Sequence, residues 1–144
     1  MKKLVLLLLA VGLLVVPSIA FAADTEVTIK ASDDLKYDVT EIKAKAGTKV
    51  KITITNVGVN AAMLHNVVVL KSTADVNAFG MAAMTAGEAK HYIPESGDII
   101  AHTEMAKPGE SKSIEFTAPA AGDYPYICSF PGHYAIMKGV LKVS

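Results

Sequence analysis

Three side chains that can bind a soft metal ion lie on one short stretch near the C-terminus: Cys128, His133 and Met137. Four residues separate Cys128 from His133, and three separate His133 from Met137. Pro131 and Gly132 permit a tight turn that would bring the thiolate and the imidazole to one ion. A mixed sulfur and nitrogen set suits copper, and a second histidine would complete a plane of three ligands with a distant methionine. The stretch therefore predicts a mononuclear copper site.

The second histidine must come from elsewhere in the chain, where His65, His91 and His102 are the candidates. His65 lies just before the apolar run 67–70, which is typical of a central strand covered on both faces. His91 and His102 lie within or just after a polar insertion, and neither opens a buried strand. We therefore expect His65 to supply the second imidazole.

Other chemistries would use the same residue types. A Cys–His nucleophilic pair would also need an orienting Asn or Asp and an oxyanion site, and it has no use for Met137 at a fixed spacing. Zinc accepts the same histidines and cysteine, and a copper chaperone or storage protein would favour two or three soft ligands. A fragment of a multicopper oxidase would need further histidine clusters, and only His91 and His102 remain. We expect an electron carrier and not an enzyme, because protein groups fill the site and leave no position for a substrate.

The first 22 residues have the pattern of a secretory signal peptide. Two lysines precede an apolar run at residues 4–16, and residues 20–22 (Ala-Phe-Ala) form a small-x-small cleavage pattern. An uncleaved anchor is the weaker alternative, because a helix needs roughly 20 apolar residues to span a bilayer. No cysteine near the cleavage site offers a lipid attachment point. We expect residues 1–22 to be removed during export, to the periplasm or beyond, and residues 23–144 to form one copper-binding domain.

The composition narrows the classes of partner. The chain has 14 lysines, no arginine and 14 acidic residues, and without the two lysines of the leader the net charge is about −2. This balance, together with the lack of arginine, argues against nucleic acid as a partner. The single cysteine cannot form an internal disulfide, and a free thiol in an exported protein calls for an explanation. Metal ligation provides one.

Alternation of apolar and polar residues predominates after the leader and predicts strands with one face in the core. It is clearest in Val27–Ile29, Ile42–Ala46 and Val50–Ile54. Tyr37 is out of phase with the second of these segments, so we expect a bulge or kink near Thr40. About eight strands with turn signals at this spacing predict an all-β sandwich with Greek-key connections.

Residues 72–97 break this pattern and are rich in alanine and methionine. We expect an insertion that carries one short helix, from about Ala74 to Met84. Met81 and Met84 would be extra copper ligands in one interpretation. The favoured interpretation is that they fill gaps where the helix packs on a sheet.

The chain resembles the azurins and auracyanins, blue copper proteins of the cupredoxin family. The likeness covers nearly all of the chain after the leader and is strongest from Tyr92 onward. It is carried by the segment Met63–Asn66, by Ile99–Thr103 and by the loop Cys128–Gly139, with its Cys-x-Phe-Pro-Gly-His-x-x-x-Met signature. The resemblance implies an eight-stranded Greek-key sandwich that holds one type 1 copper ion and carries electrons.

The resemblance also implies roles for single residues. His65, Cys128 and His133 would be the equatorial copper ligands, and Met137 the axial one. Asn66 would tie the first ligand segment to the cysteine loop. The backbone N–H groups of Asn66 and of Phe130 would point at the cysteine sulfur.

Two features depart from the azurin pattern. Azurins usually have a disulfide near the mature N-terminus, which a single cysteine cannot form, so the choice between azurin and auracyanin stays open. They also usually have glycine before the first histidine, where this chain has Leu64. The carbonyl of that residue is a weak fifth contact in the family, and Leu64 leaves that contact in doubt.

The expected partners are a redox donor and a redox acceptor protein. They would dock at a small apolar patch around His133, because a transient encounter needs a surface that desolvates easily. We expect a monomer with neither a nucleic-acid partner nor a small-molecule substrate. The residues expected in this apolar patch are Met63, Leu64, Phe130, Pro131 and Ala135.

Overall fold

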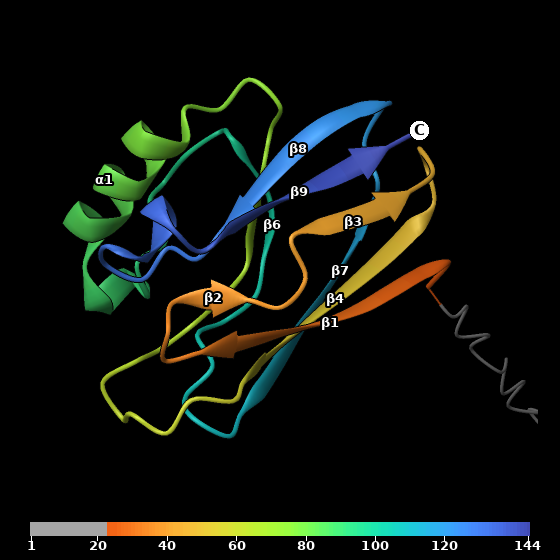
Figure 1. Ribbon diagram of the computed structural model, residues 1–144. Coiled ribbons are helices and arrows are strands. Elements are labelled where there is room, and N and C mark those ends of the chain that lie inside the picture. Colours follow the sequence, from red (N-terminus) through yellow and green to blue (C-terminus); the bar gives the residue numbers. More distant parts are fainter. Residues whose placement is uncertain (1–22) are drawn as a thin grey trace, which may run out of the picture.

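Two β-sheets face each other in the structure, a computed structural model that describes residues 23–144 (Figure 1). The first sheet has the order β2-β1-β4-β7 and the second the order β3-β9-β8-β5-β6. The strands are β1 (Thr25–Ser32), β2 (Lys36–Tyr37), β3 (Glu41–Ala44), β4 (Lys49–Asn56), β5 (Val68–Leu70), β6 (Ile99–His102), β7 (Ser111–Thr117), β8 (Gly122–Ile127) and β9 (Lys138–Val143). The predicted sandwich is confirmed, with nine strands in place of about eight. The predicted signal peptide lies outside the described residues.

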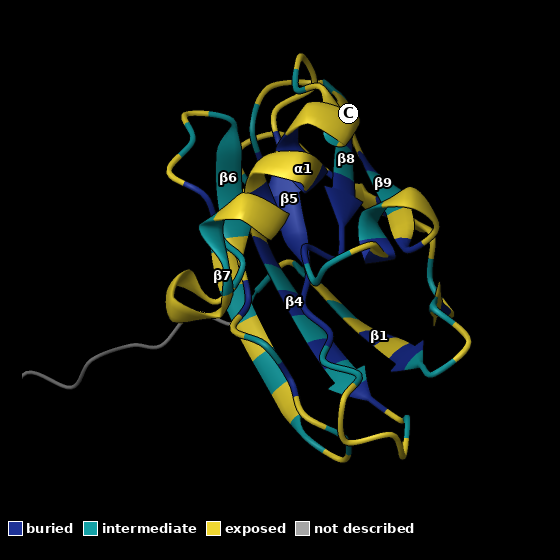
Figure 2. Cartoon of the chain, turned by 90° about the vertical axis from the view of Figure 1, so that its left-hand side faces the viewer, coloured by how far each residue is buried: buried dark blue, intermediate teal, exposed yellow. Residues whose placement is uncertain are grey.

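The main core lies between the two sheets. Along β4, alternate residues from Val50 to Asn56 are buried, and those between them are half-buried (Figure 2). β4 pairs in parallel with β1 and antiparallel with β7, so it is an inner strand of its sheet. This placement explains why its inward side chains are fully buried.

The change of phase near Thr40 marks a change of sheet. Tyr37 pairs with Ala31 in the first sheet, whereas Ile42 pairs with Leu141 in the second. The chain therefore crosses between the sheets at the predicted kink, which separates β2 from β3. β3 ends at Ala44, so the alternation that the sequence extends to residue 46 stops earlier.

The helix α1 (Val76–Ala86) covers the outer face of the second sheet. Asp75 caps its first turn, because a carboxylate oxygen accepts hydrogen bonds from the N–H groups of Asn77 and Ala78 at 2.9 and 3.0 Å. Figures 1 and 2 show α1 lying beside the loop that follows β8. β5 is consequently buried on both faces, as the apolar run in the sequence predicted.

The interpretation of the two helix methionines as packing residues is wrong. Met81 is 64% exposed and Met84 is 49% exposed, because the face of α1 that meets the sheet carries Phe79, Gly80 and Ala83 instead. None of the described helices is long and apolar enough to span a membrane.

Candidate metal centre

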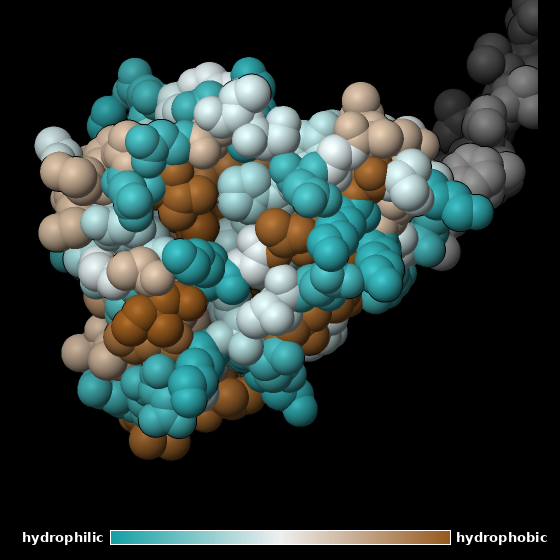
Figure 3. All heavy atoms as spheres, turned by 45° about the horizontal axis from the view of Figure 1, so that its top comes forward, coloured by the Kyte–Doolittle hydropathy of each residue, from teal (hydrophilic) through white to brown (hydrophobic). Residues whose placement is uncertain are grey.

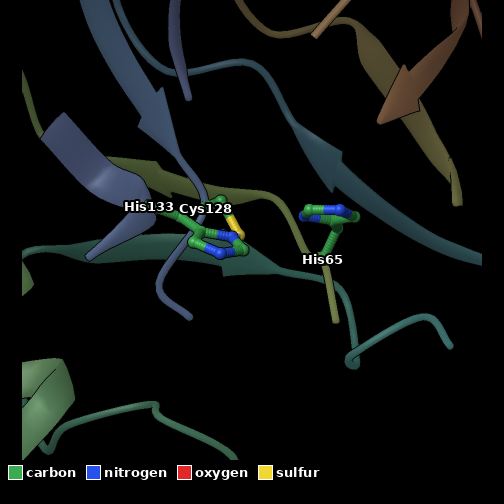
Figure 4. Close-up of side chains that lie close together, drawn as sticks. All are labelled: His65, Cys128 and His133. Atoms are coloured by element: carbon green, nitrogen blue, oxygen red, sulfur yellow. Dashed lines mark hydrogen bonds between the residues drawn. The ribbon is translucent and has the colours of Figure 1, made fainter. Parts of the chain in front are cut away.

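Three side chains from two separate segments meet at one end of the sandwich. The possible ligand atoms of His65, Cys128 and His133 all lie within 4.8 Å of one another, and all three residues are buried. The Cys128 sulfur is 3.6 Å from Nδ1 of His133, and the centroids of the two imidazole rings are 5.1 Å apart. Figure 4 shows the His133 ring beside the sulfur and the His65 ring across from them. Atoms that bind one ion at about 2.0–2.3 Å each have a similar mutual spacing.

The backbone around His65 is fixed by two neighbouring segments. The His65 N–H donates to the Ala106 carbonyl at 3.2 Å, and the Ala106 N–H donates back to the His65 carbonyl at 2.8 Å. Asn56, at the end of β4, is fully buried, and its side-chain amide donates to the carbonyls of Met63 and Ala106 at 2.9 and 3.1 Å. These contacts restrict where the imidazole can lie.

The other two residues of the cluster lie on the loop between β8 and β9. The Cys128 N–H donates to the Met137 carbonyl at 3.0 Å, and the Met137 N–H donates to the His133 carbonyl at 2.8 Å. Gly132 has a φ of 80° and directly precedes the 3₁₀ helix η2 (His133–Ala135), a left-handed conformation that favours glycine. Met137 is fully buried in the same core cluster as Cys128. The loop thus closes on itself around the sulfur and the imidazole.

Asn66 connects the two ligand segments, as the resemblance implied. Its side-chain amide donates to the Ser129 hydroxyl at 2.9 Å, and its side-chain oxygen accepts from the Ser129 N–H at 2.9 Å. The backbone N–H groups of Asn66 and Phe130 lie close enough to the Cys128 sulfur to lower the pKa of the thiol by hydrogen bonding. The expected ties around the sulfur are therefore confirmed.

Burial dominates the electrostatics of the cluster. It raises the pKa of the Cys128 thiol to about 11, although the N–H groups of Asn66 and Phe130 and the Tyr37 hydroxyl act in the opposite direction. Burial, followed by the neighbouring His65, lowers the pKa of His133 to about 4. Burial also lowers the pKa of His65, against a smaller opposing effect of the Asp33 charge. Both imidazoles are consequently neutral at pH 7, and their ring nitrogens can donate lone pairs to a metal.

His65 shows that the cluster fits a metal ion. Both of its ring nitrogens are buried and have no hydrogen-bond partner among the described residues. A buried polar atom without a partner is costly and calls for an explanation such as a bound ion. The soft sulfur of Cys128 beside two imidazoles matches the ligand preferences of copper.

The structure separates the remaining histidines from the cluster. Among the described residues, the only group of potential metal ligands that lie this close together is the one formed by His65, Cys128 and His133. His91 and His102 are both exposed. The preference for His65 over these two rivals agrees with this arrangement.

Two residues that support the cluster were not identified from the sequence. Asn56 continues the inward-facing alternation of β4, so a polar residue at a core position was the available signal. Tyr37 is buried, and its hydroxyl donates to the carbonyl oxygen of Asn66. An inward-facing tyrosine is usually a packing residue, so its sequence position alone carries no comparable signal.

Comparisons with known proteins agree with this site. Residues 23–144 match the family described as copper binding proteins, plastocyanin/azurin family. The chain is 42% identical to azurin-2 of Alcaligenes xylosoxydans xylosoxydans over 129 residues, covering 84% of this chain and 98% of that protein. It is 39% identical to auracyanin-A of Chloroflexus aurantiacus over 114 residues, covering 78% of this chain and 69% of that protein.

A solved structure is also similar. The dithionite-reduced auracyanin of the photosynthetic bacterium Roseiflexus castenholzii superimposes with a TM-score of 0.76 at 38% sequence identity. The match covers 85% of this chain and 99% of that one. The chain is therefore an electron carrier with one type 1 copper rather than an enzyme, and its partners are redox proteins. It belongs to the plastocyanin/azurin family of copper-binding proteins.

Proposed function

We propose that His65, Cys128 and His133 are the three equatorial ligands of the type 1 copper, and that Met137 is its axial ligand. The observation that carries this assignment is the buried cluster of two imidazoles and one thiol within 4.8 Å, in which both His65 nitrogens lack a hydrogen-bond partner among residues 23–144. The bound ion supplies a centre that accepts and returns one electron. The protein keeps the ligands dry and fixed, because the four proposed ligand residues are at most 4% exposed.

The proposed route of the electron passes through the edge of His133. Phe130 packs on the His133 ring with centroids 4.8 Å apart, and Tyr92 packs edge-on against Phe130 at 5.2 Å. The residues of the expected apolar patch are half-buried, apart from Ala135, which is exposed. Such a surface supports weak and reversible docking of a redox donor or acceptor to a monomeric carrier.

Charge contributes little to this proposed docking. Without the two lysines of the leader the formal net charge is only about −2. The face drawn in Figure 3 carries apolar patches among hydrophilic side chains. Long-range electrostatic steering requires a strong field of one sign, and so small a net charge provides little of it.

We also propose that residues 1–22 are a signal peptide and that the copper domain begins at Ala23, in the periplasm or another exported compartment. The family match, which begins at residue 23, supports this boundary. N-terminal sequencing of the exported protein would test it: a first residue upstream of Ala23 would contradict the proposed cleavage site.

The ligand assignment is tested by comparing two histidines. The oxidised parent should be intensely blue because of charge transfer from the Cys128 thiolate. His65→Ala should lose or strongly change this band, whereas His102→Ala, the matched control at an exposed histidine, should keep it. Cys128→Ser should abolish the band and leave the sandwich folded, because a hydroxyl is a poor anionic ligand near neutral pH. A Cys128→Ser protein that stays blue would overturn the assignment.

A further inference from the structure

The hydroxyl of Tyr37 lies beside the metal centre, although Tyr37 is none of its proposed ligands. Tyr37 lies on β2 of the first sheet, whereas Cys128 follows β8 of the second sheet. The tyrosine side chain is 6% exposed, and its hydroxyl donates a buried hydrogen bond to the carbonyl oxygen of Asn66. Burial raises the pKa of this hydroxyl most, and the nearby Cys128 raises it further through its charge and through a side-chain hydrogen-bond contribution, so a direct effect of the hydroxyl on the sulfur must be separated by the test.

We propose that Tyr37 is a positioning residue for the copper centre: its hydroxyl holds the Asn66 backbone so that the Asn66 N–H bonds to the Cys128 sulfur. The side chain of Asn66 is already held by Ser129, through two contacts of 2.9 Å. The hydroxyl of Tyr37 fixes the remaining polar group of this residue, its carbonyl. The inference rests on the proposed function, because it concerns a sulfur that binds copper.

Loss of the hydroxyl would act on the sulfur in a definite direction. A buried carbonyl without its partner is unfavourable, so the Asn66 backbone would shift to find another donor. The N–H bond to the sulfur would then lengthen. The hydrogen bond from the Asn66 N–H to the sulfur is stronger in the reduced form of the copper centre, because the thiolate then carries more negative charge. A longer bond therefore destabilises the reduced form more than the oxidised form and lowers the reduction potential.

Two other tyrosines provide matched controls, because replacing either one with phenylalanine also removes only a hydroxyl. Tyr126 packs against Tyr37 with ring centroids 5.9 Å apart, but its hydroxyl donates to the Val39 carbonyl at 2.7 Å. The Tyr124 hydroxyl donates to the Ala120 carbonyl at 2.7 Å, near the opposite end of β8 from Cys128.

The test compares Tyr37→Phe, Tyr126→Phe and Tyr124→Phe as copper-loaded proteins. Voltammetry should show that Tyr37→Phe shifts the equilibrium toward the oxidised form by threefold or more, which is about 28 mV at 59 mV per tenfold for one electron. In the reduced, diamagnetic form, the Asn66 amide proton should move upfield in the NMR spectrum, while the Phe130 amide proton stays in place. Both controls should match the parent in both measurements.

Four outcomes are informative. Equal potentials for Tyr37→Phe and Tyr126→Phe would overturn the inference. A lower potential of Tyr37→Phe with an unmoved Asn66 amide proton would also overturn it, because the hydroxyl would then act on the sulfur directly. If Tyr37→Phe does not fold, 3-fluorotyrosine at position 37 should raise the potential and move the Asn66 amide downfield, and no movement would overturn the inference. A parent protein that lacks the blue band would instead contradict the ligand assignment.

Discussion

Cys128 must lose a proton before it can bind a metal ion. Its pKa of about 11 means that the thiol is protonated at neutral pH when no metal is present. Metal uptake therefore releases a proton from a buried group, and apparent affinity should rise with pH. The N–H groups of Asn66 and Phe130 that point at the sulfur reduce this barrier without adding a charge. The Tyr37 hydroxyl acts in the same direction, so backbone dipoles and one neutral side chain together favour the thiolate.

Met137 should control the reduction potential more than it controls copper binding. We predict that Met137→Leu stays blue and binds copper, but that its potential rises, because a weak donor that favours the oxidised ion has been removed. Voltammetry measures the change. Met81→Leu is the matched control, because Met81 is 64% exposed on α1, and this variant should leave the potential unchanged. An unchanged or lower potential in Met137→Leu would show that Met137 is not axial.

The residues of the metal centre differ in how far the sequence predicts them. The single cysteine and the spacing to His133 and Met137 predict a copper loop because these residue types are rare and their donor atoms are specific. Tyr37 could not be predicted in the same way, since its contact with Asn66 joins residues 29 positions apart. A tertiary hydrogen bond of this kind leaves no local pattern in either segment.

At the scale of the secondary-structure elements, the helix α1 contacts the 3₁₀ helix η2 at Gly80. A Cβ added at Gly80 would overlap the ring of Tyr134, the residue that follows His133. In an isolated helix, alanine is more stable than glycine by about 0.8–1.0 kcal/mol. We predict the opposite sign here, because overpacking costs about 1–3 kcal/mol. Gly80→Ala should therefore lower the free energy of unfolding, measured by urea denaturation of the metal-free protein.

The same substitution should also alter the copper spectrum, since Tyr134 belongs to the 3₁₀ helix that begins at His133. Gly97→Ala is a suitable control, because nothing lies within 4 Å of the added Cβ and its φ is not in the left-handed region. We expect the free energy of unfolding of this control to change by less than about 0.5 kcal/mol. A Gly80→Ala protein more stable than its parent would mean that Tyr134 moves away without penalty.

The strands were easier to predict than their arrangement. Alternation in β4 and the apolar run at β5 identify an inward-facing strand and a fully covered strand, because burial imposes those patterns directly. The change of sheet near Thr40 appears in the sequence only as a change of phase. The outward-facing methionines of α1 were misjudged because which face of a short helix meets the sheet depends on the crossing geometry, here fixed by Gly80 and Tyr134.

For the molecule as a whole, the buried histidines make the stability of the metal-free protein depend on pH. The pKa of His133 falls from its ordinary value of 6.5 to about 4 on folding, and that of His65 also falls. Below pH 6.5 the unfolded chain therefore binds protons that the folded chain does not bind. The free energy of unfolding should decrease as pH falls, by up to about 1.4 kcal/mol per pH unit for each histidine.

Urea denaturation between pH 7 and 5 measures this dependence, above the range in which carboxyl groups titrate. A double variant, His91→Ala with His102→Ala, is the control, because both side chains are exposed and lie outside the cluster. It should retain the full dependence on pH. A parent protein whose stability is constant from pH 7 to 5 would show that His65 and His133 are not held neutral by the fold.

The surface through which the whole molecule exchanges electrons can be tested with one added charge. Ala135 is exposed on η2, close to the almost buried His133. We predict that Ala135→Lys leaves the blue band and the potential nearly unchanged. It should slow electron self-exchange by at least about tenfold, because desolvating or repelling the ammonium group costs about 1.4 kcal/mol or more in the encounter complex. Ala121→Lys adds the same charge at an exposed residue near the opposite end of β8, so it should exchange as fast as the parent. Line broadening in mixtures of the two oxidation states measures both rates, and equal rates would mean that the electron leaves by another face.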